Sequence, residues 1–403
     1  MKRKIFLIFL YLYALVFSVS KAVRFPNSWS EAHWMLDYRF GFIKRGLAGE
    51  VFGLFFNKNE WNILLVSSVI LAVLYISLLI IAFRETFKRR ENVTWKVIFY
   101  LTFFLSQYIV FSAHLIGYLD HIIFLLAILA VQLIKYKKIL LASIIVSISI
   151  LVHEISFFLM LPICFFALIV NEIPNGRFSL KSIFSSGLLT KTGLLLALPV
   201  IVTLGISVHQ ELYGGNNHFI IFNYLKQFKF IGEKAADSVA GAYTGKFSVY
   251  LADEGRYFFS RVFFSKASVM YGIPILFLLY VVYKVFQKID VYLFLLLAAT
   301  TLFPLLLHAI AWDTYRIWSF PYMILFLGFW ILSSKFKNEI YSPQKISVFE
   351  IVIFIVSVLL VSLVPNILMD NETERFSLLQ RVLIMLPVFF MAGYYLKASK
   401  KVF

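Results

Sequence analysis

Residues 62–83 have the sequence NILLVSSVILAVLYISLLIIAF, which contains no charged side chain. A helical run of this length matches the thickness of the hydrocarbon core of a bilayer. Similar apolar runs recur along the whole chain, whose 403 residues are 61% hydrophobic and whose mean hydropathy is +0.86. The runs do not alternate between polar and apolar residues, as barrel strands do. The sequence therefore predicts an all-α polytopic membrane protein.

We predict about twelve membrane-spanning helices, which form a single transmembrane domain over residues 1–403. The expected spans lie near residues 5–20, 62–83, 97–113, 120–134, 139–153, 155–170, 193–208, 269–285, 290–309, 317–334, 348–366 and 382–396. The first span follows Met-Lys-Arg-Lys, as in a signal peptide. No small-residue cleavage site follows it, so we expect this span to be retained.

Lys and Arg residues predict the orientation of these spans. Short basic clusters occur at 88–90 (Lys-Arg-Arg) and 135–138 (Lys-Tyr-Lys-Lys), and both fall on the side that the N-terminus shares. Basic residues concentrate on the cytoplasmic side, so we expect both termini to be cytoplasmic. The net charge of +17 then reflects topology and contact with anionic membrane lipids, and not nucleic-acid binding. The single cysteine, Cys164, excludes an intrachain disulfide and a cysteine-based metal site.

Two long outer loops are predicted, at about 21–61 and 209–268. Loops of such length usually have a function. Small, basic and apolar residues alternate over 41–53, and aromatic residues recur over 219–230. Both patterns predict amphipathic juxtamembrane helices. The small-residue stretch 240–245 is expected to be flexible.

The first outer loop carries unusually many ionisable residues for a chain that is 15% charged. Asp37 is the first candidate for a catalytic base and Glu31 is the second, since a carboxylate can accept a proton. Arg39, Lys44 and Arg45 are candidate phosphate ligands at headgroup level. The alternatives are a salt bridge for Asp37, a helix cap for Glu31, and attraction of the cations to anionic lipid.

Further acids and histidines fall on the same predicted side, where four other segments end or begin. They are His114, Asp120, His121, His153, Glu154, His308, Asp313 and Arg316. Ionisable groups at membrane depth are costly and tend to mark functional sites. We therefore expect them to line one aqueous cavity that opens outward, the alternative being that they are ordinary polar loop residues.

More specific roles are predicted for two pairs within this set. His153 and Glu154 would bind a metal, orient a substrate hydroxyl, or link helices by a buried hydrogen bond. They are not part of a His-Glu-x-x-His pattern, so a zinc protease of that type is not supported. Asp313 and Arg316 are three residues apart and would pair on one helical face, or Arg316 would hold a phosphate.

In layout the chain resembles the GT-C class of membrane glycosyltransferases. The resemblance covers about the first 165 residues and a short piece near 313. It rests on an acid in the first outer loop (Asp37 or Glu31), an Asp that opens a later span (Asp120), a His-containing segment that runs into Pro (151–162), and a late outer Arg beside an acid (Asp313, Arg316). Members of the class act outside the membrane on polyprenyl-phosphate-linked sugars.

The resemblance implies a direct displacement in which a carboxylate deprotonates an acceptor hydroxyl and cations stabilise the leaving phosphate. The chain departs from the class in two respects: its first-loop acids are six residues apart and not adjacent, and it has no soluble outer domain. No protein metal site is predicted, and the need for a divalent cation stays open.

The function predicted from these features is transfer of a sugar from a polyprenyl-phosphate donor to a cell-surface glycan or glycolipid. The expected location is a bacterial inner membrane with an extracytoplasmic active face. One alternative is a polymerase of the O-antigen or exopolysaccharide type, which joins lipid-linked repeat units. Another is a transporter or flippase of lipid-linked sugar, for which repeated halves and broken helices are typical. The sequence does not identify the sugar, the linkage or the acceptor.

Overall fold

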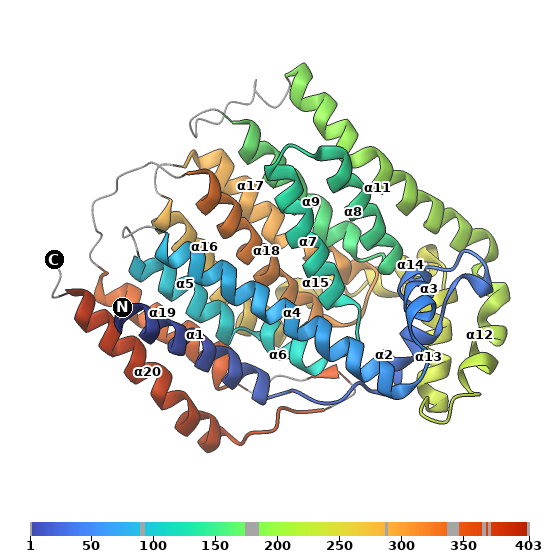
Figure 1. Cartoon of the computed structure of the whole chain (residues 1–403), viewed down its shortest axis with the longest axis horizontal. Coiled ribbons are helices and arrows are strands. Elements are labelled where there is room, and N and C mark those ends of the chain that lie inside the picture. Colours follow the sequence, from blue (N-terminus) through green and yellow to red (C-terminus); the bar gives the residue numbers. More distant parts are fainter. Residues whose placement is uncertain are drawn as a thin grey trace.

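A computed structural model describes residues 2–88, 93–173, 185–286, 289–336, 346–364, 368–369 and 372–400. Its elements are α-helices and short 3-10 helices (Figure 1). The first half contains α1 (Lys2–Ser20), α2 (Ser28–Met35), η1 (Tyr38–Phe40), α3 (Gly46–Phe55), α4 (Glu60–Phe87), α5 (Val93–Leu105), α6 (Gln107–His114), α7 (Asp120–Lys135), α8 (Ile139–Val152) and α9 (Ser156–Glu172). The second half contains α11 (Ser186–Tyr213), η3 (Gly214–Asn217), α12 (His218–Leu225), α13 (Glu233–Thr244), α14 (Phe247–Gly255), α15 (Phe258–Phe263), α16 (Lys266–Val285), α17 (Val291–Leu302), η4 (Phe303–Ala309), α18 (Thr314–Lys335), α19 (Val348–Ser362) and α20 (Leu378–Lys400).

Membrane-spanning character is evident in seven helical segments, which are long and apolar enough to cross a bilayer. They are α4, α5 with α6, α11, α16, α17 with η4, α18 and α20. The helices α1, α8, α9 and α19 are apolar but shorter. The prediction of an α-helical membrane protein is thus confirmed at this level, and each predicted span coincides with a helix or with two consecutive helices.

The surfaces of these helices differ according to their place in the bundle. On α4, the exposed residues Leu65, Val69, Val73, Ile76 and Ile80 recur every three to four positions and are 46–59% exposed. An exposed helix face of this composition suits lipid and not water. By contrast, α18 is buried from Ile317 to Ser333. The outer helices therefore shield a core in which α18 is central, as Figure 1 shows.

The third predicted span is two helices. Ser106 has an extended backbone and separates α5 from α6. The Ser106 N–H donates to the Phe103 carbonyl of α5 at 3.0 Å, and the Ser106 carbonyl accepts from the N–H of Ile109 in α6 at 3.1 Å. The side-chain amide of Gln107 is buried there, and neither of its polar atoms has a partner in the described part of the chain. A break of this kind is tolerated inside a membrane only where other groups surround it.

Helices from both long predicted loops gather at one end of the bundle, at the right of Figure 1. The first loop supplies α2 and α3, and the second supplies α12, α13 and α14, whereas α15 lies near the centre of the view and packs on η4. The predicted flexibility of 240–245 is wrong over most of the stretch: Ala240 and Tyr243 are fully buried in α13. The small side chains of α13 allow it to approach α2 closely. On another side of α13, Gln210 of α11 donates a hydrogen bond of 2.9 Å to the Tyr243 carbonyl.

The two ends of the chain lie together. The rings of Phe6 in α1 and Tyr394 in α20 are 5.4 Å apart. In Figure 1 the N-terminal end of α1 and the C-terminal end of α20 lie at the left, opposite α2, α3 and α12. Of the predicted basic cluster at 88–90, Arg89 and Arg90 lie outside the described residues.

Gly49 fixes the position of α3 and gives a direct test of this fold. A Cβ at Gly49 would lie 1.9 Å from the carbonyl oxygen of Leu36, which is backbone and cannot rotate away. We expect Gly49→Ala to lower the free energy of unfolding by roughly 1–3 kcal/mol or more, as overpacking does. Thermal unfolding of the detergent-solubilised protein measures this loss.

A matched control is Gly193→Ala in α11, where an added Cβ meets no atom within 4 Å. That change should be neutral or stabilising by about 0.5–1 kcal/mol, because Ala favours the helix. Equal melting temperatures for the two variants would contradict the close approach of α3 to Leu36.

Candidate functional site

Asp120 and Arg316 form a bidentate ion pair between the first turn of α7 and the first turn of α18. Nε of Arg316 donates to Oδ2 of Asp120 at 2.8 Å, and Nη2 donates to Oδ1 at 2.7 Å. Nη1 of Arg316 also donates to Asp313 at 3.0 Å. The carboxylate of Asp120 suits its position, since a helix N-terminus favours negative charge. One guanidinium thus holds two acids, as the spacing of Asp313 and Arg316 had suggested.

Arg45 and Glu154 form a second ion pair, between the first outer loop and the turn that joins α8 to α9. Nε of Arg45 donates to Oε2 of Glu154 at 2.8 Å, and Nδ1 of His153 lies 3.2 Å from the same oxygen. Arg45 has a left-handed backbone, with φ of 61°, immediately before α3. Burial would raise the pKa of Glu154, but Arg45 and His153 together lower it well below its usual range. Glu154 is therefore an ionised ligand for Arg45 and not a proton acceptor.

His33 of α2 links these two ion pairs. Its Nδ1 lies 3.1 Å from the Tyr243 hydroxyl, and its ring lies 5.7 Å from that of Tyr118. Burial lowers the pKa of His33 well below its usual range, and the charges of Arg45 and Arg316 lower it further. The Tyr243 ring lies 5.9 Å from the Arg45 guanidinium, and the Tyr118 ring lies 5.8 Å from that of Arg316. His33 thus connects the two ion pairs through these two rings, and we treat the pairs as one group. We call this group the buried ion cluster; it consists of Arg45, His153, Glu154, Asp120, Asp313 and Arg316.

Lys44 lies beside the buried ion cluster and is the least neutralised of its cations. Its ammonium donates to the Gly245 carbonyl at 3.3 Å and lies 5.0 Å from the centre of the Tyr250 ring. Burial lowers the pKa of Lys44 to about 8, although Glu154 opposes this shift. An ammonium that has lost water and faces only a carbonyl and a ring would gain most from an added anion.

Asp37 belongs to a different group of charges, in which Arg39 and Lys58 are its partners. Oδ1 of Asp37 accepts from Nε of Arg39 at 2.7 Å, and Oδ2 accepts from Lys58. Burial would raise the pKa of Asp37, but its hydrogen bonds with these two cations leave the pKa below its ordinary value. The salt-bridge alternative for Asp37 therefore describes its contacts.

Glu31 is buried in α2 and differs from Asp37 in having no cation beside it. Its carboxylate forms neither a hydrogen bond nor an ion pair with the described residues. Burial raises the pKa of Glu31 to about 7, and the nearby Glu60 carboxylate contributes to this rise. Of the two predicted bases, Glu31 thus has the pKa that suits proton transfer near neutral pH.

The predicted histidines occupy three environments. The ring of His121 contacts the carbonyls of Ser112 at 2.7 Å and Tyr118 at 3.1 Å, and it lines a small pocket with Asp120, Arg316 and Tyr108. His114 pairs with Arg24 instead, and His308 has no hydrogen-bond partner in the described part of the chain. The cavity expected from five segments is therefore a packed ion cluster joined by four of them, without His114, His308 or Asp37.

A second set of buried charges was not predicted. Glu374 pairs with Arg381 at 2.8 Å and lies 3.9 Å from the ammonium of Lys21, and all three side chains are buried. They join the C-terminal end of α1 to the segment that precedes α20. Glu374 and Arg381 are seven positions apart, but Lys21 is more than 350 positions from Glu374, so local spacing does not predict its place in this set. Lys58, His33 and Tyr243 were missed because only packing brings them to their partners.

No family of proteins, no curated protein and no solved structure matches this chain significantly. The fold and the site thus define an α-helical membrane protein with a buried ion cluster at the end where its long loops gather. Within the described ranges, no three His, Cys, Asp or Glu residues converge as a metal-ligand set would.

Glu31 should make the stability of the protein depend on pH. The pKa of Glu31 is about 7 in the fold and 4.5 for an ordinary glutamate, so the folded state binds more protons between these values. Stability should therefore fall as the pH rises from about 4.5 to about 7. We expect Glu31→Gln to reduce this decline in a series of melting curves across that range.

The control is Glu233→Gln, which neutralises an exposed acid of the second outer loop and should leave the pH dependence intact. Glu60→Gln should have an intermediate effect, because it removes the repulsion that raises the pKa of Glu31. A Glu31→Gln protein with the same pH slope as the wild type would refute this account of Glu31.

Proposed function

We propose that this protein is a membrane glycosyltransferase that moves a sugar from a polyprenyl-phosphate-linked donor to a glycan or glycolipid acceptor. The observation that carries the proposal is the buried ion cluster, which with Lys44 brings three cations together at the end of the bundle where both long loops gather. A lipid-linked phosphate needs such cations at headgroup level.

We further propose twelve spans, with both termini in the cytoplasm and the cluster on the extracytoplasmic face of a cell inner membrane. Ion pairs between segments that are far apart in the sequence support this topology. If successive spans alternate in direction, both partners of each such pair fall on the same side of the membrane. Arg316 with Asp120 and Lys21 with Glu374 join predicted outer ends. Lys284 with Glu350 joins predicted inner ends.

Lys44 is the proposed first contact of the donor phosphate, with Arg45 and Arg316 beside it. Arg45 and Arg316 already hold carboxylates, so a phosphate would share their remaining N–H groups or displace an acid. Lys44 needs no such exchange, because within the described ranges its ammonium has only the Gly245 carbonyl and the Tyr250 ring as partners. These cations would stabilise the negative charge that develops on the leaving phosphate.

Glu31 is the proposed proton acceptor, and Asp37 is the second candidate. In a single displacement, a Glu31 carboxylate oxygen takes the proton of the acceptor hydroxyl. The hydroxyl oxygen then bonds to the anomeric carbon as the bond from that carbon to the phosphate oxygen breaks, which inverts the anomeric centre. Asp37 would serve only after Arg39 or Lys58 had moved away from it. No step is assigned to a divalent cation.

A second candidate function, transport of a lipid-linked sugar across the membrane, is favoured by one observation. The helix break at Ser106, with the buried Gln107 amide beside it, is a feature of transporter helices. The ionised side chains of the buried ion cluster lie at helix ends, however, with Asp120 in the first turn of α7 and Arg316 in the first turn of α18. We therefore rank transport below transfer.

Deleting the gene in the source cell and analysing its surface glycans tests the proposal. We expect loss of one sugar substituent, restored by the wild type and by Glu233→Gln but reduced at least about a hundredfold in transfer rate by Glu31→Gln, the usual scale for a missing general base. Single-repeat chains would indicate a polymerase instead. Unchanged glycans, or inner-leaflet accumulation of a complete lipid-linked sugar, would contradict a transferase.

A further inference from the structure

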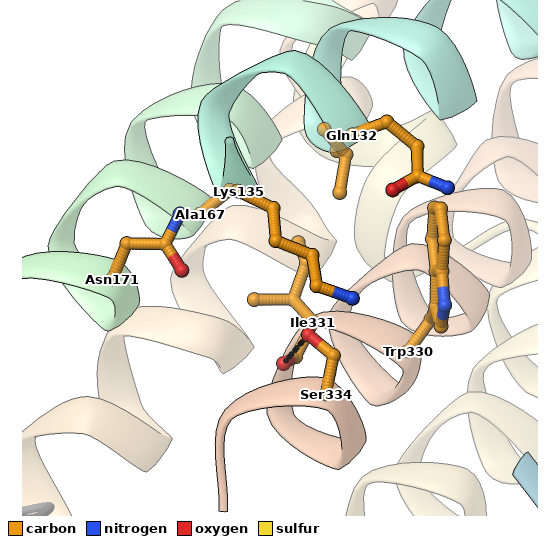
Figure 2. Close-up of a pocket in the computed structure, with 8 residues that line it drawn as sticks. Gln132, Lys135, Ala167, Asn171, Trp330, Ile331 and Ser334 are labelled. Atoms are coloured by element: carbon orange, nitrogen blue, oxygen red, sulfur yellow. Dashed lines mark hydrogen bonds between the residues drawn. The ribbon is translucent and has the colours of Figure 1, made fainter. Parts of the chain in front are cut away.

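A pocket lies at the C-terminal ends of α7, α9 and α18. Figure 2 shows Lys135 extending across it from α7, with Gln132 and Trp330 on one side and Asn171 on the other. The lining residues are Val131, Gln132, Lys135, Ala167, Asn171, Trp330, Ile331 and Ser334. The opposite ends of the same helices carry Asp120, Glu154 and Arg316, so this pocket is separate from the buried ion cluster.

Lysines surround the pocket and exceed the acids beside it. Lys335 donates to the Asn171 carbonyl at 2.9 Å, and Lys191 pairs with Glu172 at 2.6 Å. Lys137 and Lys138, in the turn after α7, are exposed, and their ammonium groups contact no partner within the described ranges. Two cations are thus available to an anion at the edge of the pocket.

The turn that carries these lysines is also apolar on its exposed surface. Tyr136 is 66% exposed, and Leu129 on α7 and Leu140 on α8 are 43% and 52% exposed. Trp330 lines the pocket itself. The rings of Tyr136 and Trp330 thus lie near both exposed aliphatic side chains and lysine ammonium groups. This combination is typical of residues at the interface between a membrane and water. A soluble anion would make no favourable contact with the exposed apolar residues Leu129, Tyr136 and Leu140, whereas a lipid would.

We propose that this end of α7, α9 and α18 binds the phosphodiester headgroup of an anionic phospholipid. Lys137 and Lys138 contact the phosphate at the edge of the pocket, and the acyl chains lie along Leu129 and Leu140. The pocket itself has room for about one water molecule, which would satisfy Oε1 of Gln132, an atom without a partner among the described residues. Basic pockets between helices at a cytoplasmic face bind anionic headgroups in this way. The proposal is independent of the proposed transferase activity.

Native mass spectrometry of the full-length protein in detergent tests this site. Phosphatidylglycerol should be retained and phosphatidylcholine of the same acyl chains should not. The double variant K137Q/K138Q should retain less phosphatidylglycerol, by roughly fivefold for each lysine removed. K137R/K138R, which keeps both charges, should retain it as the wild type does.

The matched control is K229Q/K234Q, which removes two exposed lysines from the second outer loop and should leave lipid retention unchanged. Equal retention of both lipids by the wild type would overturn the proposal. So would wild-type retention by K137Q/K138Q, or displacement of the lipid by inorganic phosphate, which would indicate a site for soluble anions. Because the readout is lipid binding, its failure would say nothing of glycan transfer.

Discussion

The need to neutralise buried charge beside a membrane organises this structure. Burying an isolated ion costs a large free energy of desolvation. This cost is offset only where oppositely charged partners form well-aligned hydrogen bonds with the ion. Arg316 meets this condition through two bonds to Asp120 and one to Asp313. The pair ties the first turn of α7 to that of α18, the helix at the centre of the bundle. The turn between α8 and α9 and the first outer loop then join through Arg45 and Glu154.

This constraint also separates the roles of the first-loop residues. Arg45 lies in the buried ion cluster and Lys44 beside it, whereas Arg39 neutralises Asp37 together with Lys58. Glu31 is left without a cation, and its pKa rises to about 7. The residue that the sequence ranked second as a base is therefore the one whose environment suits proton transfer. Asp37 would have to lose a cation before it could accept a proton, whereas Glu31, on the same segment, has no ion pair among the described residues.

Helical spans could be predicted from the sequence because apolar length is a local property, as in α4 and α18. Counting alternate spans placed Asp120, Glu154 and Arg316 on one predicted side, and the structure brings all three into the buried ion cluster. The partners of each charge did not follow, since Asp120 and Arg316 are 196 positions apart and only packing brings them together. The break at Ser106 and the burial of α13 were missed for a related reason: apolar or small residues predict neither an interrupted helix nor a close contact between helices. The lipid-facing lysines at 137 and 138 were recognised only as topology signals.

The central claim is that Arg45 and Arg316 belong to one electrostatic unit, and a double-mutant cycle tests it most directly. The free energy of unfolding would be measured for Arg45→Gln, Arg316→Gln and the double variant, with Arg39→Gln combined with Arg316→Gln as the matched cycle. Two cations in one cluster repel each other, and each single variant relieves this repulsion, so the Arg45–Arg316 double variant should lose more stability than the sum of the two single losses, by more than about 0.5 kcal/mol. The Arg39 cycle should be additive. Additive losses in both cycles would contradict the account.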